Sequence, residues 1–284
     1  MRKFLVAQSE TPDEREARRA RTGQSSGETY ADTLRELDAA AEIEICQPAD
    51  ADSPVFTPDE LARFDAVFLT GSPLHVYDDT PEVRRQLAFM RAVFASGTPS
   101  FGSCAGLQVA VVAAGGSVRK MPARMEAGLS RRIVATSAGR EHPLLAGRPT
   151  TWDAPAIHGD EVATLPDGAT RLAGNDVTQV QAAEIRFDKG VFWGVQYHPE
   201  LSLEEIAIAL RRQAPDLVEA GLADDEREVE ERADVMEALH HAPQRRSLRW
   251  RLGVDGELAD QDGRRREIVN FLSALPTIDR RGAR

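Results

Sequence analysis

Three residues of this sequence have the types and spacing needed for nucleophilic catalysis. They are a cysteine between two glycines and, far downstream, a histidine and a glutamate. Cys104 lies in residues 102–108, GSCAGLQ, and His198 and Glu200 lie in residues 196–200, QYHPE. Acyl transfer through a thiol needs a nucleophile, a base that activates it and an acidic group that orients the base. The three residues therefore predict a Cys104 nucleophile, a His198 base and a Glu200 partner.

The elements on either side of Cys104 are expected to hold its thiol at a sharp turn. Residues 98–101 are typical of a short buried strand, and residues 107–114 are typical of an apolar helix. A nucleophile at a strand-to-helix turn projects above the sheet, and Gly102 and Gly106 leave room for the strained backbone of such a turn. The neighbouring helix N-terminus also favours the thiolate form.

The histidine is expected to raise the reactivity of the thiol. Residues 190–195 predict a buried strand that places His198 at the edge of a sheet, where sites commonly form. A free thiol has a pKa of about 8.5, so only a small fraction is ionised at neutral pH. His198 would accept the proton or pair with the thiolate, and Glu200 would fix the imidazole tautomer and stabilise its charged form.

Backbone donors for a developing oxyanion are expected near the thiol. Residues 67–73, VFLTGSP, predict a buried strand that runs into a tight turn. The backbone N–H of Ser72, paired with that of Ala105, would serve as the oxyanion hole, although a plain turn is the alternative interpretation. Cys46 lies in an alternating strand-like run without a glycine turn, so we interpret it as structural.

These segments together resemble the class I, triad-type glutamine amidotransferases, and in particular the glutaminase part of GMP synthases. Members of that family carry an oxyanion turn, a G-x-C-x-G-x-Q elbow and a Q-x-H-P-E motif, in that order, together with a Ser-His-Gly-Asp-x-Val element. The corresponding residues here are 70–73, 102–108, 196–200 and 157–162. The resemblance spans roughly residues 1–212.

The resemblance implies an α/β fold in which a mostly parallel, open, flavodoxin-like sheet is flanked by helices. It implies the triad roles given above and a γ-glutamyl thioester on the cysteine. It also implies that Gly71, Gln108, Gly159 and Asp160 hold the amino-acid end of the substrate. His158 either takes part in this contact or only caps the turn.

Two residues depart from the family pattern. Ser72 replaces the second glycine of the oxyanion turn, which leaves the backbone N–H available but constrains the turn differently. Ile157 replaces a polar residue that often precedes the histidine, which weakens the transfer of detailed substrate contacts. Neither departure touches the triad.

Composition narrows the classes of partner. The 284 residues carry a net charge of −11, which argues against nucleic acid or an anionic membrane as a partner. Two cysteines in unlike surroundings predict neither a disulfide framework nor a thiolate metal site, and we expect no metal. Residues 1–7 have too short an apolar run for a signal peptide, and no run approaches a membrane span. A cytoplasmic location is therefore expected.

The chain divides into two parts by composition. Residues 1–212 alternate strand-like and helix-like runs, which predicts a mostly parallel sheet covered by helices. Residues 213–284 are charge-dense, lack strand signals and carry apolar residues at helical spacing, which predicts a helical extension. Its apolar stripes must pack on the sheet domain, on a second copy in a homodimer, or on a partner. Ser202 and Glu205 predict a capping box at the start of the last helix before it.

Three functions follow from these features. The first is a glutaminase that hydrolyses the side-chain amide of glutamine and supplies ammonia to a separate ATP-dependent synthetase. The chain has no Gly-rich phosphate loop, so neither an ATP-using step nor a cofactor is expected in it. The second is a stand-alone γ-glutamyl hydrolase or transferase that acts on a γ-glutamyl amide or peptide. The third is a non-catalytic regulatory subunit, against which the intact triad argues.

Overall fold

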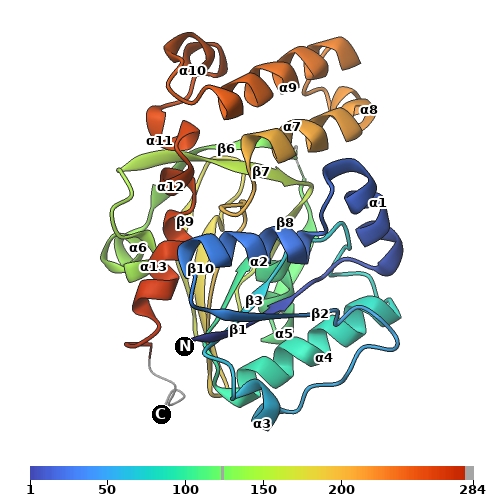
Figure 1. The fold of residues 1–284 in the computed structure, drawn as a ribbon, viewed down its shortest axis with the longest axis vertical. Coiled ribbons are helices and arrows are strands. Elements are labelled where there is room, and N and C mark those ends of the chain that lie inside the picture. The colour runs from blue at the N-terminus through green and yellow to red at the C-terminus, as the bar shows by residue number, and fades with distance from the viewer. Residues whose placement is uncertain (123–124, 279–284) are drawn as a thin grey trace.

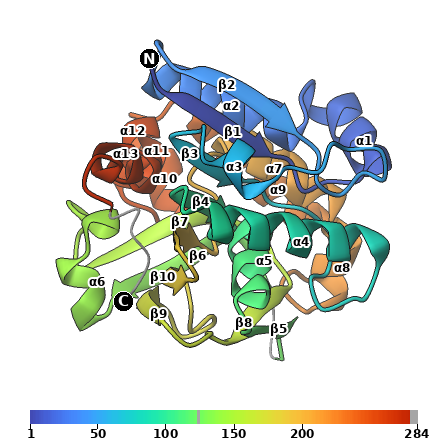
Figure 2. The same ribbon diagram turned by 90° about the horizontal axis from the view of Figure 1, so that it is seen from below.

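The computed structural model describes residues 1–122 and 125–278 of the chain. In this part, nine strands form one mixed sheet, and helices cover both of its faces (Figures 1 and 2). The strand order is β2-β1-β3-β4-β11-β10-β9-β6-β7. This arrangement confirms the α/β class expected from the sequence.

The first five strands in that order are parallel, and the last four add antiparallel pairs. The parallel strands are β1 (Lys3–Ala7), β2 (Glu42–Cys46), β3 (Ala66–Leu69), β4 (Ser100–Ser103) and β11 (Gly190–Val195). The antiparallel strands are β6 (Glu126–Ala135), β7 (Thr151–His158), β9 (Ala169–Gly174) and β10 (Ala182–Phe187). A separate pair joins β5 (Ser117–Lys120) to β8 (Asp160–Thr164).

The central strands follow directly from their apolar sequences. Every residue of β3 and β11 is buried, and strands covered on both faces have continuous apolar runs. The strand expected at residues 179–185 begins only at Ala182. A turn lies just before these residues, where Asn175 Oδ1 accepts hydrogen bonds from the N–H groups of Val177 and Thr178.

Two pairs of helices sandwich the parallel half of the sheet. Helices α2 (Ser26–Leu37) and α13 (Arg266–Ala274) pack on one face, and α4 (Pro81–Ser96) and α5 (Ala105–Ala113) pack on the other (Figure 2). Shorter helices complete the connections. They are α3 (Pro58–Leu61), α6 (Ser137–Glu141) and the 3₁₀ turn η1 (Pro143–Leu145).

The charged segment after β1 forms two helices. Helix α1 (Pro12–Thr22) ends at Gly23, whose left-handed φ of 81° suits a glycine. Capping boxes open both α1 and α2, with Thr11 and Ser25 as the N-cap residues. The chain therefore stops and restarts its helix, and α1 projects beyond the carboxyl ends of the parallel strands (Figure 1).

The last part of the chain first builds a helical layer over β6 and β7. This layer contains α7 (Leu203–Arg212), α8 (Ala214–Glu219), α9 (Glu226–His241) and α10 (Arg246–Leu252), followed by α11 (Gly256–Ala259) and α12 (Gln261–Arg264) (Figure 1). The capping box expected from Ser202 and Glu205 opens α7. Leu129 of β6 belongs to the same apolar cluster as these helices.

Helix α13 then returns to the sheet and fills its core. Phe271 is fully buried, and its ring centroid lies 5.5 Å from those of Phe68 and Phe101 and 5.7 Å from that of Trp193. The expected extension, residues 213–284, thus includes a core helix as well as outer helices, and its last residues, 279–284, lie outside the described part. The domain boundary at residue 212 stays a prediction.

A buried ion pair attaches α13 to the strand end that precedes His198. Glu267 accepts a 2.8 Å hydrogen bond from the hydroxyl of Tyr197 and pairs with Arg148 at 2.6 Å. Among the described residues, no helix is both long and apolar enough to cross a membrane.

We predict that Phe271→Ala lowers the free energy of unfolding by about 3–5 kcal/mol, because it leaves a cavity among three aromatic side chains. Denaturant unfolding followed by circular dichroism measures the change. Val269→Ala, on the half-exposed face of the same helix, is the control and should change stability by no more than about 0.5 kcal/mol. Equal stability of the two variants would contradict a core role for α13.

Candidate active site

Cys104 sits at a strained turn between β4 and α5. Its backbone has φ 52° and ψ −110°, which a residue with a side chain rarely adopts. The two flanking glycines permit this turn by close approach. A Cβ on Gly102 would lie 2.9 Å from the carbonyl carbon of Gly106, and one on Gly106 would lie 2.6 Å from the carbonyl oxygen of Leu69.

His198 and Glu200 form a buried pair beside the turn. His198 Nδ1 lies 2.7 Å from Glu200 Oε1, and both side chains are almost fully buried. Burial lowers the pKa of His198, but the Glu200 carboxylate and the Cys104 sulfur outweigh it and raise this pKa to about 10. The imidazolium form is therefore favoured at neutral pH.

The turn after β3 closes on the edge of this imidazole. A Cβ on Gly71 would lie 2.8 Å from His198 Cε1, so a side chain does not fit there. The Thr70 hydroxyl donates to the carbonyl of Gly71 and accepts from the backbone N–H of Ser9. Ser72 Oγ accepts a 3.0 Å hydrogen bond from the N–H of Leu74. The turn is thus held by hydrogen bonds from both of its sides.

His158 holds the turn between β7 and β8. Its Nδ1 lies 2.9 Å from the carbonyl oxygen of Asp160, and its Nε2 lies 3.1 Å from the Glu126 carboxylate. Both partners are hydrogen-bond acceptors. Burial raises the pKa of Glu126, but the hydrogen bond and charge of His158 outweigh it and lower this pKa below its ordinary value.

The residues expected to hold the substrate lie beside that turn. Gln108 Nε2 lies 3.3 Å from the carbonyl oxygen of Asp160. The Asp160 carboxylate accepts a hydrogen bond from the hydroxyl of Tyr77 at 3.1 Å and lies 2.6 Å from His75 Nδ1. The loop after the oxyanion turn therefore reaches across and fixes the turn that contains Gly159.

Sequence reasoning missed Glu126, His75 and Tyr77. Glu126 carries little local signal, because all but one of its partners lie at least 32 residues away along the chain. Its partners are Ser130, His158, Asn175, Thr178 and Gln181. His75 and Tyr77 follow the Gly-Ser-Pro turn closely, so their position was the one signal that could have found them.

A cavity of about 690 Å³ joins these groups. Its lining includes all three triad candidates and the expected Gly71, Ser72, Gln108, Gly159 and Asp160. Ala105, the other expected oxyanion donor, is the first residue of α5 and follows Cys104 directly. The cavity continues past the three triad candidates to a wall formed by α1, α7 and α8.

Cys46 differs from Cys104 in its surroundings. It is buried in β2, and burial raises the pKa of its thiol to about 12. A thiol of this kind stays protonated and unreactive at neutral pH, which agrees with a structural role.

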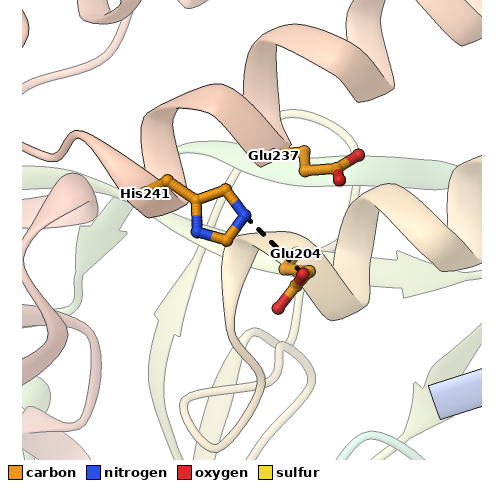
Figure 3. A group of neighbouring side chains, drawn as sticks. All are labelled: Glu204, Glu237 and His241. Carbon is orange, nitrogen blue, oxygen red and sulfur yellow. Dashed lines mark ion pairs between the residues drawn. The ribbon is translucent and has the colours of Figure 1, made fainter.

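A second group of ionisable side chains lies between α7 and α9. Glu204, Glu237 and His241 have potential ligand atoms within 4.8 Å of one another, so they could hold a metal ion (Figure 3). Glu237 already pairs with Arg211 at 2.8 Å, and His241 Nε2 lies 3.8 Å from Glu204. These ion pairs join α7 to α9, so the three side chains have a structural role without a metal ion.

Comparisons with known proteins agree with the geometry. Over residues 22–213 the chain matches the family described as glutamine amidotransferase class-I. It is 35% identical to a γ-glutamyl-L-1-hydroxyisopropylamide hydrolase of a Pseudomonas species, over 98% of this chain and 95% of the relative. It is also 35% identical to a GMP synthase of Leifsonia xyli, but over 49% of this chain and only 26% of that protein.

Solved structures show the same fold. A glutamine amidotransferase from Thermotoga maritima superposes with a TM-score of 0.63 and 18% identity, over 96% of this chain and 97% of the other. The family match covers more than half of the chain and contains the strained cysteine turn and its buried histidine. The chain therefore belongs to the class I glutamine amidotransferase family.

Proposed function

We propose that this protein is a stand-alone hydrolase that cleaves the amide bond of γ-glutamyl amides. The observation that carries the proposal is the walled cavity beyond the triad. Glutamine releases only ammonia, which needs almost none of that space, whereas a substituted amine would occupy it. The similarity to a γ-glutamyl amide hydrolase along nearly the whole chain, including the C-terminal helices, supports the same function.

Bond cleavage in this proposal starts from the thiolate–imidazolium pair. The Cys104 sulfur attacks the γ-carbonyl carbon, and the N–H groups of Ser72 and Ala105 stabilise the oxyanion. His198 donates its proton to the departing amine as the C–N bond breaks, which leaves a γ-glutamyl thioester. His198, now neutral, takes a proton from water, which attacks the thioester and releases glutamate.

Substrate comparison tests the proposal. Purified protein is given glutamine or γ-glutamylethylamide, and glutamate release is followed by chromatography. We expect a higher kcat/KM for the substituted amide, and loss of turnover with both substrates in a folded His198→Ala variant. A higher kcat/KM for glutamine would contradict the proposal.

Ammonia supply to a separate synthetase is the second candidate function. The similarity to GMP synthases favours it, including 34% identity to a glutamine-hydrolysing GMP synthase subunit of Methanoculleus marisnigri over 37% of this chain and 54% of that protein. Glutamine turnover that rises when such a synthetase is added would favour this function over the first.

Removal of the Glu200 charge should shift the pH profile. We predict that Glu200→Gln lowers the pKa of His198, because the carboxylate favours the imidazolium form. The alkaline limb of kcat/KM should therefore move to lower pH by about one unit or more. Glu204→Gln, four residues away on the outer side of α7, is the control. An unchanged alkaline limb in Glu200→Gln would remove this carboxylate from the mechanism.

Selective alkylation should distinguish the two cysteines. A glutamine-like diazo ketone should label Cys104, which lines the cavity, and spare Cys46, whose raised pKa keeps it protonated. Peptide mapping by mass spectrometry locates the label. Labelling of both thiols at equal rates would show that Cys104 has no special reactivity.

A further inference from the structure

The wall of the cavity beyond the triad carries arginine side chains. Arg18 and Arg21 come from successive turns of α1, and Arg212 is the last residue of α7. All three line the cavity that contains Cys104. Arg21 and Arg212 are exposed, so water solvates their guanidinium groups unless a ligand in the cavity replaces it.

Three carboxylates of the same wall are engaged by protein donors, whereas Asp216 of α8 has no hydrogen-bond donor among the described residues and lies close enough to Arg212 to oppose its neighbouring positive charges. Glu14 and Glu205 accept from the N-cap residues of α1 and α7. Glu10 is buried and accepts from the backbone and side chain of Ser26 and from Gln8. Glu14 and Glu205 therefore cap the N-termini of α1 and α7, and Glu10 holds the loop after β1.

The arginines differ in how well they are paired. Arg18 donates to Glu205 at 2.9 Å. Within residues 1–122 and 125–278, the side chains of Arg21 and Arg212 make no hydrogen bond and no ion pair within 4.0 Å. Burial lowers the pKa of Arg212, and the charges of Arg21 and Arg18 lower it further, against smaller opposing effects of Asp216 and Glu10. Arg21 and Arg212 are therefore the arginines of this wall whose guanidinium groups are not already used by a protein partner among the described residues.

The leaving group of the proposed reaction departs into the same cavity that these arginines line. His198 protonates the departing nitrogen, so the amine lies on the side of His198 and Glu200. Glu200 is followed almost directly by α7, which forms the wall that ends at Arg212. The turn at Gly159 and Gln108 lie elsewhere in the lining, where the γ-glutamyl end is expected.

We propose that Arg21 and Arg212 bind a carboxylate on the leaving amine, so that the preferred substrates are γ-glutamyl amino acids. This inference rests on the proposed function and specifies its substrate class. Guanidinium groups suit a carboxylate through paired, charge-assisted hydrogen bonds. The reaction remains a hydrolysis: water is consumed, the C–N bond breaks, and glutamate and a free amino acid are released.

A matched pair of substrates tests the carboxylate. γ-Glutamyl-L-alanine and γ-glutamyl-L-1-hydroxyisopropylamide differ only by a carboxylate in place of a hydroxymethyl group. We expect the wild-type protein to have a kcat/KM at least about tenfold higher for the first compound, since a hydrogen bond between charged groups is worth about a factor of ten or more. Added salt should narrow this difference.

Variants of the arginines give the decisive comparison. Arg212→Gln and Arg21→Gln should each lower the ratio of the two kcat/KM values by about tenfold. Arg19→Gln is the control, because Arg19 lies on the same helix but pairs with Glu28 on the surface. A wild-type preference for the neutral compound, or a ratio that neither pocket variant changes, would overturn the proposal.

Binding separates failure of the subsite from failure of the proposed function. Calorimetry with Cys104→Ala protein measures the affinity for both compounds without turnover. Tighter binding of γ-glutamyl-L-alanine that Arg212→Gln weakens would support the subsite even if the wild-type protein hydrolysed neither compound. Equal binding of the two compounds, or no binding of either, would overturn it.

Discussion

The close packing of backbone around Cys104 is the constraint on which the rest of the site depends. β4, α5 and β3 approach so closely that neither Gly102 nor Gly106 has room for a Cβ. The positive φ of Cys104 is stabilised by a 2.8 Å hydrogen bond from its backbone N–H to the carbonyl of Val195 in β11. The strand that carries this carbonyl also leads to His198. The nucleophile and its proposed base are thus placed by one backbone contact.

Side chains next to this turn fix both the His198 imidazole and the turn at Asp160. The imidazole of His198 is fixed by Glu200 on one side and by the absence of a side chain on Gly71 on the other. The turn at Asp160 is held by the buried Glu126–His158 pair. Burial of polar groups costs free energy that hydrogen bonds offset, and here these hydrogen bonds give the cavity a defined shape before a substrate arrives.

The C-terminal helices take part in the same construction. Helix α7 begins next to Glu200 and walls the cavity, while α13 packs Phe271 into the sheet and links Glu267 to Tyr197 beside His198. These helices therefore contribute to the shape of the cavity as well as to the fold.

Local sequence was sufficient for the features that depend on neighbouring residues. The buried strands β3 and β11 and the capping box of α7 follow from apolar runs and turn chemistry within a few residues. The cysteine turn was predictable for the same reason, because glycines on both sides of a reactive residue have few other uses. The return of α13 to the core was not predictable from the sequence, because an amphipathic pattern does not specify which surface the helix covers.

The sequence by itself determined the family, the α/β class and which cysteine, histidine and glutamate are the candidates for chemistry. Tertiary structure alone decided that Glu126 pairs with His158, that Tyr77 and His75 meet Asp160, and that Arg21 and Arg212 face one cavity. The physical reason is distance along the chain. Contacts between residues far apart in sequence depend on how the whole sheet and its helices pack, and no local pattern of residues encodes that arrangement.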